Sequence, residues 1–178
     1  ENLLIYARIL NKRSKYRLAI EVLKETLEVN KKQTKGETQK ANYASICIEL
    51  SKNYKNLEQV DSTLYFINQY AALHNKSNDF FEKLDVAAIY IYLEKIDLAL
   101  LELNKIKLLN NETEASRNIM IKKLRLLGEI YDKKKDYPKA LEYYEKALIA
   151  NTPNFYTNPN EPEITSVGHL LYTLRAKA

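Results

Sequence analysis

Apolar residues recur at three- and four-residue spacing along almost the whole chain, and no run of alternating apolar and polar residues competes with this pattern. This spacing is typical of amphipathic helices, which turn one apolar stripe towards a neighbour. Polar breaks divide the pattern into separate segments. We therefore predict eight helices near residues 2–12, 15–30, 38–55, 58–74, 78–93, 96–109, 113–133 and 137–151, and a ninth that begins near residue 163.

The predicted boundaries carry residues that commonly separate helices. Gly36 lies in the polar run NKKQTKGETQ, and Asp136 precedes Tyr137 and Pro138. An aspartate at this place can cap the helix, and a proline in the first turn loses no hydrogen bond. Three of the four prolines fall in the stretch NTPNFYTNPNEPE, which predicts one long loop before the last helix.

Four pairs of small residues, each twelve positions apart, suggest that the helices form a repeated design. The pairs are Ala7 with Ala19, Ser51 with Thr63, Ala87 with Ala99, and Gly128 with Ala140. Larger apolar or aromatic residues recur at fixed places around each pair. Two antiparallel helices approach closely only where small side chains face each other, so each pair predicts the contact within one helical hairpin.

The last of these units, LLGEIY followed by DY and ALEYYEKAL, resembles a tetratricopeptide repeat. The residues that carry the resemblance are Leu127, Gly128, Tyr131, Ala140, Tyr144 and Ala147, with Pro153 one place later than usual. The family's tryptophan is replaced by Leu3, Cys47, Lys83 and Leu124 in the four units, whose spacing is irregular. The resemblance implies an all-α, right-handed superhelix of about four antiparallel helix pairs plus a C-terminal helix. The repeats would span about 1–34, 44–78, 80–111 and 121–154 of a single array, with a loop and helix at 155–178.

The C-terminal stretch is similar to bacterial repeat arrays that precede a caspase-like peptidase domain of the CHAT class. The matching residues are Tyr143, Tyr144, Lys146, Ala147, Leu148, Asn158, Pro159, Lys177 and Ala178. This resemblance implies a regulatory role for the array, with the peptidase domain outside these residues.

Composition narrows the possible functions. The chain is 46% hydrophobic and has a formal net charge of +5, with basic residues scattered among acidic ones. We read this as a solvated helical surface; a nucleic-acid-binding helical repeat stays open as an alternative, although no known nucleic-acid motif accompanies the charge. No apolar run is long enough for a membrane span. We expect a cytoplasmic protein, and a periplasmic or secreted form stays open because the first residue is Glu1 and not methionine.

We find no candidate for catalysis, for a cofactor or for a metal. His74 and His169 lie far apart in sequence, and the three glycines are too scattered for a phosphate-binding loop. The lone Cys47 falls on an inward position of the repeat, so we predict a buried and poorly reactive thiol. The chain is therefore expected not to be an enzyme.

The resemblance places a partner-binding groove on the first helix of each repeat, at positions three before and one, four and five after the small residue. The candidate groove residues are Arg8, Lys12, Lys52, Lys55, Leu84, Ile91, Tyr92, Arg125, Glu129 and Asp132. This groove would be basic in its N-terminal half, apolar in the middle and mixed at its end. It suits a peptide or protein domain with acidic and apolar side chains. As an alternative for the apolar part, Leu84, Ile91 and Tyr92 pack against a neighbouring helix.

Overall fold

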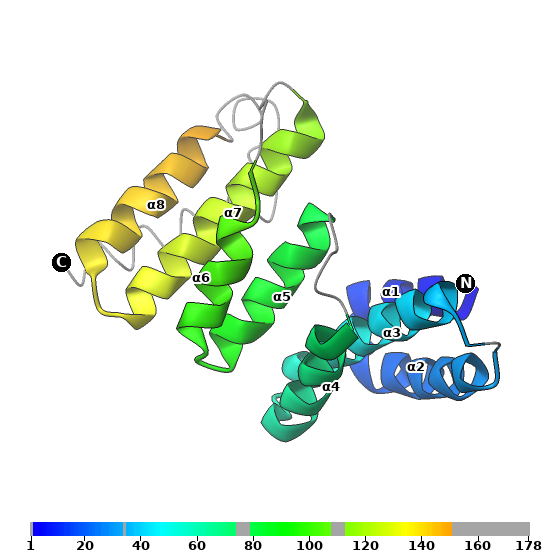
Figure 1. Cartoon of the computed structure of the whole chain (residues 1–178). Coiled ribbons are helices and arrows are strands. Elements are labelled where there is room, and N and C mark those ends of the chain that lie inside the picture. The colour runs from blue at the N-terminus through cyan, green and yellow to red at the C-terminus, as the bar shows by residue number, and fades with distance from the viewer. Residues whose placement is uncertain (1, 34, 74–78, 108–112, 151–178) are drawn as a thin grey trace. The chain divides into compact units, whose positions relative to one another are not determined.

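The computed structural model describes residues 2–33, 35–73, 79–107 and 113–150, which form eight helices and contain no strand (Figure 1). The helices are α1 (Asn2–Lys12), α2 (Tyr16–Lys31), α3 (Glu37–Asn56), α4 (Val60–Leu73), α5 (Phe80–Tyr92), α6 (Ile96–Asn104), α7 (Glu114–Lys133) and α8 (Tyr137–Ala150). The all-α prediction is thus confirmed for this part of the chain. The predicted loop and ninth helix lie outside the described residues.

Seven of the helices begin and end within two residues of the predicted bounds, whereas α6 ends at Asn104 and not near residue 109. Its last turn is tight. The backbone N–H groups of Lys105 and Ile106 donate to carbonyls only three residues back, on Glu102 and Leu103. Bonds of this kind close a helix end rather than extend it.

Each hairpin turns through the same backbone motif. Ser14, Glu58, Glu94 and Lys135 each have a positive φ between 57° and 60°. In every case the next residue donates its N–H to a carbonyl five positions back, as from Lys15 to Leu10. This combination is the Schellman helix end, in which one left-handed residue stops the helix. Each turn lies seven residues after the first small residue of its pair. The repeat found in the sequence is therefore also present in the structure.

All eight residues of the four small-residue pairs are buried, as predicted. Two of them are polar: Ser51 donates its hydroxyl to the Cys47 carbonyl at 2.9 Å, and Thr63 donates to Gln59 at 2.8 Å. Each hydroxyl is satisfied by its own helix, so it can stand in for alanine without leaving a buried polar atom unpaired.

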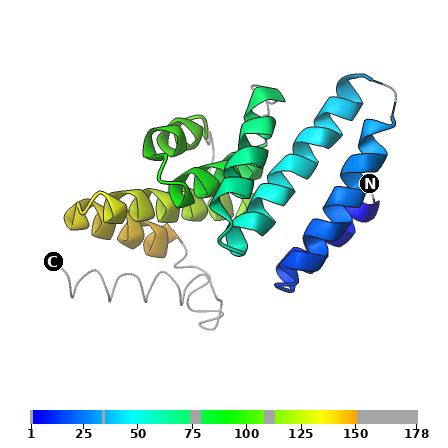
Figure 2. The same cartoon turned by 90° about the horizontal axis from the view of Figure 1, so that it is seen from below.

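The described helices fall into two compact units. The first contains α1 to α4 together with the short segment Tyr92–Glu94. Within it, α1 packs on α2, α2 on α3 and α3 on α4 (Figures 1 and 2). Its core includes Leu10, Leu23 and Leu50, none of which is more than 4% exposed. The connection from α2 to α3 is held by paired bonds, because Asn30 and Gln39 each donate a side-chain amide to the other's carbonyl.

The second unit contains α7, α8, α6 and α5 up to Ile91. Here α7 packs along α8, and α6 contacts α7. Tyr144 and Ala140 of α8 are fully buried, with Tyr131 and Tyr137 packed against them. The residues in these contacts occupy the aromatic and small-residue positions that the sequence predicts to lie in the core of this repeat.

Candidate interaction site

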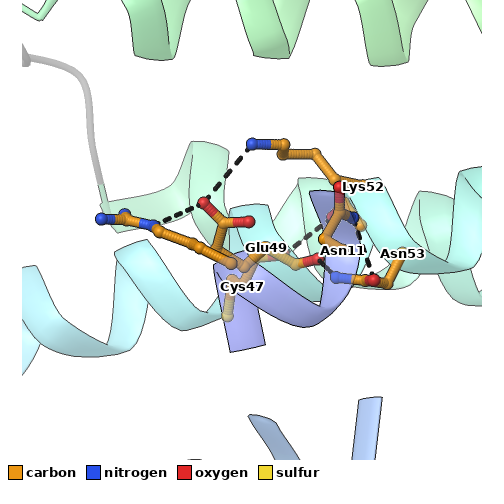
Figure 3. A network of polar contacts seen from close by, with 7 residues as sticks. Asn11, Cys47, Glu49, Lys52 and Asn53 are labelled. Atoms are coloured by element: carbon orange, nitrogen blue, oxygen red, sulfur yellow. Dashed lines mark hydrogen bonds and ion pairs between the residues drawn. The ribbon is translucent and has the colours of Figure 1, made fainter. Parts of the chain in front are cut away.

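Two helices of the first unit bring two of the predicted basic residues together. The Arg8 Nε atom of α1 lies 2.9 Å from Oε1 of Glu49 on α3, and the Lys52 Nζ atom lies 3.4 Å from the same oxygen. Figure 3 shows Glu49 joined to Lys52 by one of these contacts. The Glu49 side chain is only 5% exposed, whereas that of Arg8 is 49% exposed. The two cations therefore lie over a buried carboxylate and present their outer sides to solvent.

A pair of asparagines extends this cluster along the same two helices. Asn11 donates its side-chain amide to Oδ1 of Asn53 at 2.9 Å, and Asn53 donates to the Glu49 backbone carbonyl at 2.8 Å (Figure 3). Asn53 is fully buried. Because its oxygen and nitrogen both have partners, the amide is held in one orientation. We refer to Arg8, Asn11, Glu49, Lys52 and Asn53 as the α1–α3 polar cluster.

The repeat pattern of the sequence explains why Arg8 and Lys52 lie close together. Arg8 and Lys52 occupy equivalent places, one residue after the small residue of each repeat, so successive first helices align them. Lys12 is exposed on α1 and Lys55 is partly buried on α3. Arg8 and Lys52 thus meet at one carboxylate, and two residues of this arrangement, Glu49 and Asn53, are not among the predicted groove residues.

A signal for one of the missed residues, Asn53, exists in the sequence. Glu49 gives no such signal, because the equivalent residue of the third repeat, Asp85, is also acidic. Asn53 lies two positions after Ser51, where the fourth repeat carries Ile130. A polar residue at a position that is apolar in the other repeats of the chain indicates a buried polar contact specific to this repeat.

The apolar middle of the predicted groove is covered. Leu84 and Ile91 of α5 are each 3% exposed, and Tyr92 is partly buried. A partner could reach Leu84 or Ile91 only if the side chains around them moved. We therefore assign no docking contact to these two residues, and this burial is in line with the alternative that they pack inside the protein.

The last three candidates lie on α7 beside a buried tyrosine. Arg125, Glu129 and Asp132 are all partly buried. Burial raises the pKa of the Tyr144 hydroxyl well above its ordinary value; the charges of Glu129 and Asp132 raise it further, whereas Arg125 lowers it. The charges of these three residues therefore act on one buried hydroxyl in the second unit.

The described residues offer little for bond chemistry. They contain no group of three or more histidine, cysteine, aspartate or glutamate residues placed to hold a metal. Cys47 is buried, and burial raises the pKa of its thiol to about 11. No helix in this part of the chain is long and apolar enough to cross a membrane. His74 and His169 lie outside the described residues.

Comparison with known proteins agrees with this architecture. Residues 122–154 match the family model of the tetratricopeptide repeat. Nothing among the curated proteins matches the chain. The structure is similar to a crystal structure of nearly identical TPR-like repeats of a kinesin light chain from Podosopora anserina, with a TM-score of 0.64 and 15% sequence identity over 99% of this chain and 86% of that one. Residues 122–154 are therefore a tetratricopeptide repeat, and the chain has an all-α fold similar to that of TPR-like repeats.

Proposed function

We propose that the chain is a protein-interaction module whose α1–α3 polar cluster binds an acidic segment of a partner. Tetratricopeptide repeats serve generally as protein-interaction modules, and this supports the broad assignment. The narrower assignment rests on one observation. Arg8 and Lys52 are held side by side by Glu49, with Lys12 on the next turn of α1.

This arrangement favours carboxylates for an electrostatic reason. Glu49 is buried, whereas Arg8 and Lys12 are exposed, so solvent meets these cations and not the carboxylate. Arg8 keeps half of its side-chain surface exposed while its Nε atom is fixed by Glu49. A guanidinium held in this way loses little side-chain entropy when its remaining N–H groups bind a partner carboxylate.

The test is a fluorescence-polarisation titration of the full chain with a labelled peptide of alternating aspartate and serine. The same peptide with asparagine in place of aspartate serves as its neutral control. We expect only the acidic peptide to bind, with an affinity that falls as salt rises. Changing Arg8→Gln together with Lys12→Glu should lower its affinity about tenfold, because two charge contacts are lost.

A matched pair of substitutions separates a local effect from a change of overall charge. Arg17→Gln with Lys24→Glu changes the net charge equally, at two exposed residues of α2 outside the cluster. We expect this control to retain nearly full affinity. Equal losses of affinity in the two double variants would contradict a defined site. If the unchanged protein does not bind the acidic peptide, the proposed function is contradicted. Preferential binding of RNA to the same cations would instead favour the nucleic-acid alternative.

A further inference from the structure

A pocket of about 260 Å³ opens in the first unit between the start of α1, the end of α2 and the first half of α3. Its apolar wall is formed by Leu3, Leu4, Val29 and Ile46, and uncharged polar groups such as Asn30 and Asn42 complete it. None of the described residues that line it has a charged side chain. An apolar cavity of about 150 Å³ is large enough for a benzene ring. This pocket can therefore hold the side chain of a leucine or a phenylalanine.

One polar group in the pocket wall lacks a partner. Asn30 is 2% exposed, and its amide nitrogen donates to the Gln39 carbonyl at 3.2 Å. Its Oδ1 atom accepts no hydrogen bond from any described residue. A buried acceptor without a donor is unfavourable. This oxygen has almost no exposed surface, so a ligand in the pocket contacts the apolar wall and not this acceptor.

The pocket lies on the same two helix faces as the α1–α3 polar cluster. Leu4 of the pocket precedes Arg8 by four residues on α1, and Ile46 precedes Glu49 by three on α3. Residues at these spacings are neighbours on one face of a helix. A step of four residues along a helix covers about 6 Å. The pocket and the cations are thus about one helical turn apart, along the line where α1 and α3 meet.

We propose that the pocket receives an apolar side chain of the acidic segment that binds Arg8 and Lys52; this inference rests on the proposed function. An extended peptide advances about 3.3 Å per residue, and alternate side chains point to the same side. Two residues of peptide therefore span the distance from the pocket to Arg8. The partner motif is an apolar residue two positions from an aspartate or glutamate.

The experiment is a selection of random twelve-residue peptides, displayed on phage, against the full chain. We expect enriched sequences to carry leucine, isoleucine, methionine or phenylalanine two positions from an acidic residue. A synthetic peptide with this motif should bind about tenfold more tightly than its variant with alanine at the apolar position, because one apolar side chain is buried.

Two valines provide a matched test of the pocket. Val29 at its rim is 53% exposed, and Val60 on α4, outside the pocket, is 51% exposed. Val29→Lys should abolish the advantage of the apolar residue, whereas Val60→Lys should keep it. Both substitutions are at exposed sites, and circular dichroism will verify that each variant remains helical.

The possible results distinguish this inference from the function on which it rests. Enrichment of acidic peptides without an apolar preference would overturn the pocket assignment and leave the α1–α3 polar cluster as the binding site. An apolar preference that Val29→Lys leaves unchanged would also overturn it. Absence of any acidic enrichment would overturn the proposed function itself.

Discussion

The ring of Tyr144 on α8 lies directly against the backbone of Gly128 on α7. A Cβ atom built on Gly128 would come within 2.5 Å of Tyr144 Cε1 and within 2.7 Å of two further ring carbons. The ring is fully buried, and the same two helices form the hairpin at residues 114–150. Gly128 is therefore required at this position, because a larger side chain would collide with the ring of Tyr144 sixteen positions later.

The first prediction follows from this contact. Gly128→Ala should lower the free energy of unfolding by about 2 kcal/mol, because overpacking against a buried ring outweighs the higher helix propensity of alanine. Urea denaturation measures the change. Gly36→Ala is the control, since nothing lies within 4 Å of a Cβ atom there. Equal effects at the two glycines would contradict the proposed steric requirement.

The second prediction concerns the Tyr144 hydroxyl, which is buried and has no hydrogen-bond partner among the described residues. Tyr144→Phe removes this unsatisfied group and keeps the ring. We expect the free energy of unfolding to stay the same or to rise by up to about 1 kcal/mol. A loss above about 1 kcal/mol in thermal or urea unfolding would show that the hydroxyl has a partner that stabilises the fold.

The third prediction concerns the hairpin turns. Glu58 has a φ of 57°, a left-handed conformation that is unfavourable for residues with a Cβ atom. Glu58→Gly should raise the free energy of unfolding by about 0.5–1 kcal/mol, because this relief exceeds the entropy lost by glycine. Glu58→Ala, which keeps the Cβ atom, should not give this gain. Equal stabilities of the two variants would contradict the strain argument.

The fourth prediction tests whether Arg8 and Lys52 compensate the charge of Glu49. Replacing both cations by glutamine leaves a buried carboxylate without its ion pairs, and should cost about 2 kcal/mol of unfolding free energy. The same two changes should cost less than about 0.5 kcal/mol in a Glu49→Leu protein, because no buried charge remains. A double-mutant cycle by urea unfolding measures this coupling. Equal costs in both backgrounds would mean that the ion pairs contribute nothing.

The fifth prediction concerns Cys47. Burial raises the pKa of its thiol from its ordinary value of 9.0 to about 11, so the group favours the folded state while it is protonated. This contribution is fully present below about pH 9 and is lost as the pH rises through 11. Unfolding free energies measured from pH 8 to 11 should therefore fall more steeply in the natural chain than in a Cys47→Ala variant. Parallel curves of unfolding free energy against pH for the two proteins would contradict this prediction.

The same burial makes Cys47 a probe of the repeat register. We expect a thiol reagent at pH 8 to label the native protein far more slowly than the urea-unfolded protein, because the reactive thiolate is scarce and covered. Fast labelling of the native chain would place Cys47 at the surface and contradict the inward position assigned to it in the second repeat.

The predicted groove residues differ in how far the sequence alone can place them. Arg8 and Lys52 could be predicted as neighbours, because equivalent places in successive repeats recur at the same side of the array. Leu84 and Ile91 could not be placed. The helix that carries them, FFEKLDVAAIYIY, has apolar residues on nearly every side, so its periodicity does not reveal which of them remain exposed.

The sequence by itself determined the local design of the protein: the eight described helices, the buried pairs such as Ala7 and Ala19, and the turns between them. These features follow from apolar periodicity and side-chain size, which act between residues close in the chain. Only the tertiary structure decided that Glu49 lies beneath Arg8 and Lys52, and that a pocket with the unpaired Asn30 oxygen opens one turn away. Such contacts join residues about forty positions apart, and their register is set by how whole helices pack rather than by any local pattern.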